Sequence, residues 1–283
     1  MLAWRITLFT LISLSALPTW AAPSTSNTQH RFIAQRIITL APHLTELAFR
    51  AGLGDHIVGV SEYSDYPKQA QNIETIANYQ GIKVERVLAL KPDLIIAWQQ
   101  GPGIREVDKL ESMGIKVVRI QTQTLAQIGD NIQTLSQFSA SPKIGEQQAQ
   151  NYRQTLEKIT QANQNKPKIS FFYQLSDKPL ISVGGDGWAN EIFSRCGGRN
   201  ILSQSLAPYP QVSQEQVLKA KPEVIFSSHM SKQSGQIWQK WQDFIPALKN
   251  SHVYALNPDW ISRPTYRTLN AMQQICGYFD KVR

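Results

Sequence analysis

A twelve-residue segment occurs twice in this chain. The first copy, residues 85–96, reads Glu-Arg-Val-Leu-Ala-Leu-Lys-Pro-Asp-Leu-Ile-Ile, and the second, residues 215–226, reads Glu-Gln-Val-Leu-Lys-Ala-Lys-Pro-Glu-Val-Ile-Phe. Each copy predicts a short helix, a Lys-Pro turn and a buried strand, and a tyrosine stands six residues before each glutamate, at Tyr79 and Tyr209. A whole supersecondary unit repeated in this way predicts two similar lobes with a ligand cleft between them. The alternative is that helix-turn-strand units look alike in any α/β protein.

The first 21 residues predict a secretory signal peptide. Arg5 precedes an apolar run over 6–17, and the small residues Thr19 and Ala21 fit the pattern read by signal peptidase. The apolar run is too short to span a bilayer. We therefore expect cleavage after Ala21 and an exported, soluble mature protein.

Two cysteines, Cys196 and Cys276, are present. In an oxidising compartment the simplest expectation is one disulfide. It would close a loop of about 80 residues and contribute roughly 4 kcal/mol in the chain-entropy model.

The composition and motifs argue against several functions. The formal net charge is +8, but the basic residues are scattered, which is typical of a solvated surface and not of a nucleic-acid-binding face. No Gly-x-Ser-x-Gly or His-Glu-x-x-His motif is present, so we expect no enzyme activity. The five histidines are dispersed, and no metal site is predicted.

Strands alternate with helices along the chain, which predicts an α/β fold built from parallel βαβ units. The expected strands are 36–40, 57–60, one ending at Trp98, 116–120, 168–173 and 253–256. The expected helices include one beginning at Thr45 and others at 125–138, 188–196, 238–248 and 264–279. The predicted domains are an N-terminal lobe (22–140), a linking helix (141–166) and a C-terminal lobe (167–283).

The linking helix is predicted from its start signal and its apolar stripe. Ser141-Pro142 supplies an N-cap followed by proline at the first helical position. Ala149, Tyr152, Leu156 and Ile159 then recur at helical spacing. At 1.5 Å per residue this helix is roughly 33–36 Å long. As the single connection between the lobes, it predicts a stiff hinge.

Aromatic and polar residues are concentrated where the expected strands end. They are His43, Tyr63, Tyr66, Tyr79, Trp98, Tyr209, His229, Asp259, Trp260 and Arg263. Strand ends form the ligand-facing edge of parallel sheets, and aromatic loops suit a large, flat, partly apolar ligand. The alternative is that each aromatic packs on its own lobe, and that the two histidines are ordinary surface or hydrogen-bonding residues.

Glu85 and Glu215 occupy equivalent positions at the starts of two predicted helices. Acids at helix N-termini gain modestly from the helix dipole, which explains either one alone. A matched pair on two lobes equally suits docking onto a two-fold symmetric partner that carries arginines.

The chain resembles the periplasmic vitamin B12-binding proteins of ABC importers, in the helical-backbone (class III) family of substrate-binding proteins. The resemblance covers nearly the whole mature chain. It is carried by the segments 38–48 (ITLAPHLTELA), 60–67 (VSEYSDYP), 90–98 (LKPDLIIAW), 209–218 (YPQVSQEQVL), 259–260 (DW) and 273–276 (QQIC).

The resemblance implies two Rossmann-like lobes joined by one long helix, with cobalamin or a related corrinoid held between them. The residues that match corrinoid-contacting positions are Tyr63, Tyr79, Trp98, Tyr209, Asp259 and Arg263, with Trp260 beside Asp259 and Ile181 where a phenylalanine is usual. Tyr79 and Tyr209 replace tryptophans, and His43 and His229 lie outside the family pattern.

The resemblance also implies partners and a location. Glu85 and Glu215 match acids that dock onto the permease of an ABC importer in the inner membrane, and the two cysteines match a family disulfide. The expected protein is a periplasmic monomer with no cofactor apart from the cobalt carried by its ligand. Two alternatives remain: a same-fold protein for haem or a ferric siderophore, with a histidine or tyrosine on the iron, and a zinc or manganese importer component.

Overall fold

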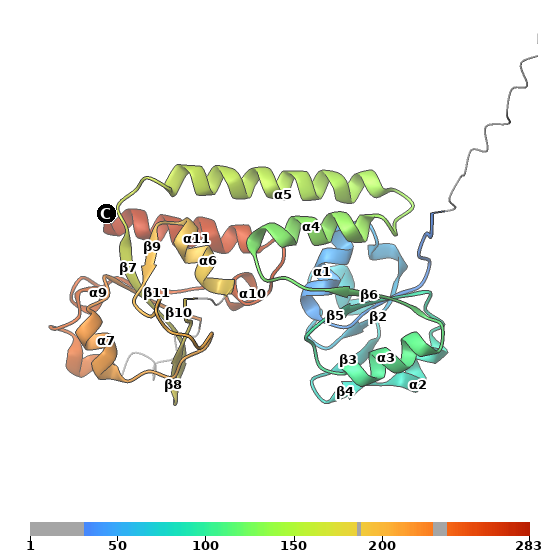
Figure 1. Ribbon diagram of the computed structural model, residues 1–283, viewed down its shortest axis with the longest axis horizontal. Helices are drawn as coiled ribbons and strands as arrows, with labels where there is room; N and C mark the ends of the chain where they lie inside the picture. The colour runs from blue at the N-terminus through green and yellow to red at the C-terminus, as the bar shows by residue number, and fades with distance from the viewer. Residues whose placement is uncertain (1–30, 186–187, 229–236) are drawn as a thin grey trace, which may run out of the picture. The chain divides into compact units, whose positions relative to one another are not determined.

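The structure is a computed structural model that describes residues 31–185, 188–228 and 237–283. The expected signal peptide and His229 lie outside these residues. The described chain forms two lobes, each built around its own sheet, and parallel strand pairs predominate in both (Figure 1). The α/β fold expected from the sequence is confirmed.

The first lobe contains a six-stranded sheet in the order β4-β3-β2-β1-β5-β6, in which only the β3–β4 pair is antiparallel. Its strands are β1 (Ile37–Thr39), β2 (Ile57–Ser61), β3 (Thr75–Asn78), β4 (Gly81–Ile82), β5 (Leu94–Trp98) and β6 (Lys116–Ile120). Its helices are α1 (Pro42–Arg50), α2 (Val84–Ala89), α3 (Ile104–Ser112) and α4 (Leu125–Ser136). The strand order reverses around β1, whose neighbours are β2 and β5, and ligands of α/β proteins commonly bind at such a point.

The second lobe contains a sheet in the order β11-β10-β7-β8, with β9 also pairing with β7. Its strands are β7 (Ile169–Asp177), β8 (Leu180–Ser182), β9 (Gly198–Asn200), β10 (Val224–Ser227) and β11 (Val253–Ala255). Its helices are α6 (Trp188–Arg195), α7 (Gln214–Ala220), α9 (Pro246–Lys249), α10 (Pro258–Ile261) and α11 (Thr268–Val282).

Apolar side chains cover both faces of each sheet. Ile37 of β1 and Phe171 of β7 belong to one large core that spans both lobes. Their neighbours Ile38 and Phe172 face two separate outer cores, one for each lobe. Burial on both faces explains why these strands read as continuous apolar runs instead of alternating patterns.

The chain passes from the first lobe to the second through α5 (Pro142–Asn163), a helix of 22 residues. Helix α5 packs against α4 and α1 of the first lobe and against α6 and α11 of the second lobe (Figure 1). Tyr152 of this helix is fully buried, and its hydroxyl donates a hydrogen bond to the Leu125 carbonyl at 3.0 Å. The apolar stripe predicted from the sequence is the face that α5 buries.

The two copies of the repeat have the same local structure. Each is a short helix (α2 or α7), a Lys-Pro turn and a central strand (β5 or β10). The lysines of the turns, Lys91 and Lys221, have positive φ values of 48° and 47°. The acids that follow, Asp93 and Glu223, accept backbone N–H bonds from the adjacent strand region, at Gln35 in one lobe and Ser170 in the other, both at 2.8 Å. The equivalent contacts confirm that the repeat is structural.

Three expected helix boundaries were wrong. Helix α1 begins at Pro42 instead of Thr45, because proline at a first helical position is pre-organised and the Thr45 hydroxyl is used in buried hydrogen bonds. The helix expected at 238–248 is instead a 3-10 turn at Gln239–Trp241 and the short α9, since Pro246 begins a new helix. The last helix begins at Thr268, after a turn in which the Thr268 N–H bonds to the Thr265 carbonyl.

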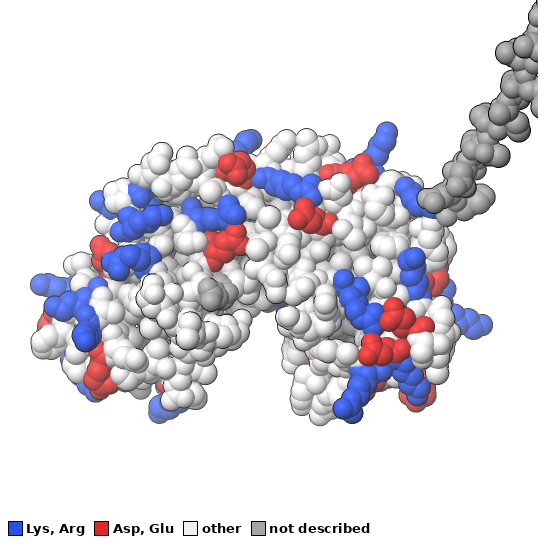
Figure 2. All heavy atoms as spheres, in the orientation of Figure 1, with Lys and Arg blue, Asp and Glu red and all other residues white. Residues whose placement is uncertain are grey.

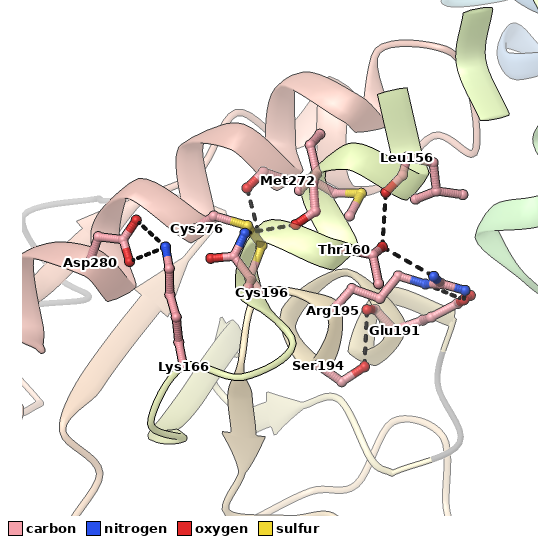
Figure 3. The surroundings of a disulfide bond; sticks show 12 residues. Leu156, Thr160, Lys166, Glu191, Ser194, Arg195, Cys196, Met272, Cys276 and Asp280 are labelled. Atoms are coloured by element: carbon pink, nitrogen blue, oxygen red, sulfur yellow. Dashed lines mark hydrogen bonds and ion pairs between the residues drawn. A yellow bond between two sulfur atoms is a disulfide. The ribbon is translucent and has the colours of Figure 1, made fainter. Parts of the chain in front are cut away.

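A disulfide joins Cys196 to Cys276, with a Cα–Cα distance of 4.8 Å. Cys196 directly follows α6, and Cys276 lies on α11, so the bond ties together two helices of the second lobe (Figure 3). The neighbouring ion pairs Arg195–Glu191 and Lys166–Asp280 lie around the same junction. The disulfide expected from the sequence is confirmed.

Basic and acidic side chains are interspersed over the face of the molecule shown in Figure 2, without a large area of one sign. Several are paired at the surface, such as Arg153 with Asp130 at 2.7 Å. Among the described residues, no helix is both long enough and apolar enough to cross a membrane.

Candidate functional site

A pocket of about 190 Å³ opens at the carboxyl edge of the first sheet. It is formed by the segments that follow β1, β2 and β3 and by the last residue of β5. Its lining includes His43, Tyr63, Asn78, Tyr79, Trp98 and Pro102. The structure thus brings together four of the expected site residues, because parallel strands place their carboxyl ends at one edge.

Three aromatic side chains line this pocket and remain open to solvent. Tyr63 is 68% exposed, Tyr79 is 78% exposed, and Trp98 is partly exposed at the end of β5. Tyr63 also has a φ of 64°, a left-handed conformation that is uncommon for a residue with a bulky side chain. Exposed aromatics grouped around a concave surface are typical of a binding site for an apolar ligand.

His43 is the most buried side chain of this group. It lies in the first turn of α1 with 8% of its surface exposed, and its ring packs edge-on against Trp98 with centroids 5.4 Å apart. Burial, together with the positive charge of Arg263, lowers the pKa of His43 to about 4. The imidazole is therefore neutral at physiological pH.

A network of charged side chains connects the two lobes beside the pocket. Glu46 of α1 is 3% exposed at its side chain and accepts two hydrogen bonds from Arg267, at 2.9 and 2.5 Å. Arg263 bonds to Asp65 at 2.7 Å and lies 3.4 Å from Glu46. Asp259 approaches Arg263 at 3.3 Å. Acids of the first lobe and arginines of the second lobe thus share one cluster.

The network lowers the pKa of Asp65. Partial burial alone would raise the pKa of Asp65, but the hydrogen bond from Arg263 and the charges of Arg263 and Arg267 outweigh burial and lower it. The guanidinium of Arg267 also lies over the Tyr66 ring, 4.3 Å from its centroid. Arg263 itself is held in place by its ion pairs with Asp65 and Asp259.

The sequence did not identify Glu46, Asp65 or Arg267 as site residues. Their partners lie about two hundred positions away in the chain, so no local pattern links them. One signal was present: Glu46 stands beside Leu47, Ala48 and Phe49, and an acid on a buried helix face needs a charged partner.

The expected residues of the second lobe are placed in two groups. Ile181 of β8 forms a β-bridge with Gln211, and the Ser182 N–H donates a hydrogen bond to the Pro210 carbonyl at 3.1 Å. The exposed Tyr209 therefore lies on a segment that pairs with β8. Trp260 of α10 is partly buried against the large core. None of these residues lines the pocket of the first sheet. His229, the second candidate histidine, falls outside the described residues.

Glu85 and Glu215 both lie in the first turn of their helices and are exposed. In each helix the valine two positions later, Val87 or Val217, is fully buried. The Glu215 carboxylate accepts hydrogen bonds from the Glu215 backbone N–H and from the Ser213 hydroxyl, and these bonds lower the pKa of Glu215. The two glutamates are therefore equivalent in backbone position and solvent access.

In the part of the chain that the structure describes, no three His, Cys, Asp or Glu side chains come together in a way that could hold a metal ion.

Comparison with known protein families identifies the class of protein to which this fold and this site belong. Residues 37–260 match the model of the periplasmic binding protein family, and the chain belongs to this family.

Relatives within the family are closely similar. The vitamin B12-binding protein of Vibrio campbellii is 51% identical over 250 residues, which cover 88% of this chain and 91% of that protein. The vitamin B12-binding protein of Yersinia pseudotuberculosis is 40% identical over 278 residues, covering 98% of this chain and 94% of that one.

Solved structures show the same architecture. The crystal structure of the periplasmic vitamin B12 binding protein of Vibrio cholerae superimposes with a TM-score of 0.81 at 49% identity, covering 89% of this chain and 98% of that one. The periplasmic haem-binding protein of the same organism gives a TM-score of 0.76 at 20% identity, covering 87% of this chain and 99% of that one, which shows a shared fold alone.

Proposed function

We propose that this protein captures cobalamin or a related corrinoid between its two lobes and delivers it to an ABC importer. The observation that carries the proposal is the aromatic pocket at the carboxyl edge of the first sheet. Tyr63, Tyr79 and Trp98 offer faces that suit a flat macrocycle, in a chain about half identical to a vitamin B12-binding protein.

The second lobe supplies the opposite side of the proposed site. Tyr209 and Ile181 lie on paired segments near the carboxyl end of β7 and offer an apolar contact. Asp259 and Arg263 meet the amide and phosphate groups at the ligand's edge, with Trp260 beside them. Because Arg263 is already bonded to Asp65, ligand binding exchanges part of that ion pair for a contact with the ligand.

The proposal includes the maturation and partner of the protein. Residues 1–21 direct export and are removed, and the lobes 22–140 and 167–283, joined by 141–166, act in the periplasm as a monomer. Glu85 and Glu215 dock onto arginines of the permease. Binding and release of a ligand of this kind require no chemical step by the protein.

Calorimetric titration with cyanocobalamin, cobinamide and haemin, with tryptophan fluorescence recorded in parallel, tests the ligand. We expect saturable binding of one corrinoid per protein and quenching of the Trp98 emission. Replacing Trp98 by leucine should weaken corrinoid binding at least tenfold, because the exposed ring face is lost. A shifted haem Soret band with no response to either corrinoid would instead identify a haem-binding protein.

A further inference from the structure

His43 has an unusual combination of burial and unused bonding capacity. Its side chain is more than nine-tenths buried, yet it lines the ligand pocket. No hydrogen bond joins either ring nitrogen to another described residue, and neither nitrogen is among the enclosed polar atoms that lack a partner. The ring nitrogens therefore reach the pocket surface, where they are free to bond to a ligand.

The surroundings of His43 keep its lone pair available. Its edge-on contact with Trp98 fixes the ring beside an aromatic face. A neutral, positioned imidazole in a mainly apolar site is a good donor to a transition metal.

We propose that the imidazole of His43 is an axial nitrogen ligand to the cobalt of a bound corrinoid. The inference rests on the proposed function and specifies one bond in that same site. A ring nitrogen donates its lone pair to cobalt, a loosely held axial water leaves, and the oxidation state of the metal does not change. Tyr63, Tyr79 and Trp98 contact the macrocycle around this bond.

Such a bond explains why a histidine occupies this place. Its ring nitrogens have no partner among the described residues and lie at the pocket, so coordination to cobalt gives a ring nitrogen a bonding partner when the ligand arrives. The bond also favours corrinoids whose axial position exchanges readily, such as aquo forms and cobinamide, over forms with a firmly held axial group.

Electron paramagnetic resonance of the protein loaded with cob(II)inamide tests the proposal directly. This corrinoid has no benzimidazole base of its own, so any axial nitrogen must come from the protein. We expect each high-field cobalt line to split into a triplet, and into a doublet when the protein carries histidine labelled with ¹⁵N. His43→Gln and His43→Asn should bind cobinamide more weakly, and at concentrations that saturate the weakened site the splitting should be absent. His56→Gln, which lies outside the pocket, should keep it.

Three other results would contradict the proposal. Bound cob(II)inamide without nitrogen splitting in the unmodified protein would refute coordination by any histidine. Splitting that persists in both His43 variants would assign the bond to another residue. The unmodified protein and the labelled sample give a result even where a variant does not fold. Failure to bind cobinamide or cobalamin at all would overturn the proposed function and not merely this bond.

Discussion

Glu46 is a buried carboxylate on α1, and Leu44, Leu47 and Ala48 are buried on the same helix. Its charge is matched by Arg267 and Arg263, which come from the other lobe. Taking a carboxylate out of water is costly unless such partners are in place. A single residue on α1 therefore links the stability of the first lobe to the position of two arginines in the second.

We expect Glu46→Gln to lower the free energy of unfolding by about 3 kcal/mol, because it leaves the mostly buried guanidinium of Arg267 without its main counter-charge and removes a nearby negative charge from Arg263. Urea denaturation followed by circular dichroism measures the change. Asp130→Asn breaks the exposed pair with Arg153 and should change stability by less than about 0.5 kcal/mol. Equal effects of the two substitutions would show that the ion pairs of Glu46 with Arg263 and Arg267, here called the Glu46 cluster, contribute no more stability than an exposed ion pair.

His43 predicts a pH dependence of stability with a definite sign. Its pKa is about 4 in the folded protein and 6.5 when unfolded, so the unfolded chain takes up the proton first. The contribution to stability is complete above pH 6.5 and is lost as the pH falls towards 4, by roughly 3 kcal/mol in total. Denaturation profiles between pH 7 and 4 should be steeper for the unmodified protein than for His43→Gln. Parallel profiles would mean that the imidazole is not buried.

At the scale of secondary structure, two glycines on helices have opposite surroundings. A Cβ at Gly145 of α5 would lie 2.5 Å from the Ser136 Cβ and 3.0 Å from the Ala51 Cα. A Cβ at Gly277 of α11 would meet nothing within 4 Å. Gly145 is therefore required by close packing of α5 on the first lobe, whereas Gly277 only weakens its helix.

We expect Gly145→Ala to destabilise the protein by about 1–3 kcal/mol, because overpacking outweighs the gain in helix propensity. Gly277→Ala should stabilise it by about 0.5–1 kcal/mol, since the new methyl group is unhindered. Thermal unfolding of both variants checks the contrast. A gain in stability at Gly145 would contradict the close approach of the helices.

The sequence predicted long elements better than short ones. The long apolar stripe of α5 and the strands that end at Trp98 and Ile120 were found because their patterns extend over several residues. Strands β3, β4, β8 and β9 were missed, whereas the equally short β1 and β11 were found because they lie within the mostly apolar segments 36–40 and 253–256. The aromatic site was predictable because its residues directly follow strands, whereas the Glu46 cluster depends on how two lobes pack.

At the scale of the whole molecule, the lobes are joined by more than the covalent passage through α5. The Glu191 carboxylate of α6 accepts the backbone N–H of Leu125 at the start of α4, at 2.7 Å. The Glu46 cluster adds ion pairs, and Arg50 lies over the Tyr266 ring. The stiff connection expected from a single helix is thus reinforced by non-covalent contacts, and we expect only small rotations between the lobes on ligand binding.

Reversing the charge of both repeat glutamates tests their proposed docking role. We expect Glu85→Lys with Glu215→Lys to reduce corrinoid uptake by cells at least tenfold, because two attractive contacts with the permease become repulsive. Corrinoid affinity measured by calorimetry should not change, since both residues lie outside the pocket. Glu146→Lys with Glu157→Lys, both exposed on α5, makes the same change in overall charge away from the two helix starts. Normal uptake by the double variant would refute the docking role.

The equivalence of the two repeat copies has a kinetic consequence. A partner with two-fold symmetry presents the same surface after a half-turn, so a protein whose two contact points are interchangeable can land productively in either of two orientations. The number of successful collisions doubles without any stronger contact, which corresponds to about 0.4 kcal/mol of free energy. Under the proposed docking role of Glu85 and Glu215, the duplicated helix starts double the number of productive orientations on a two-fold symmetric permease.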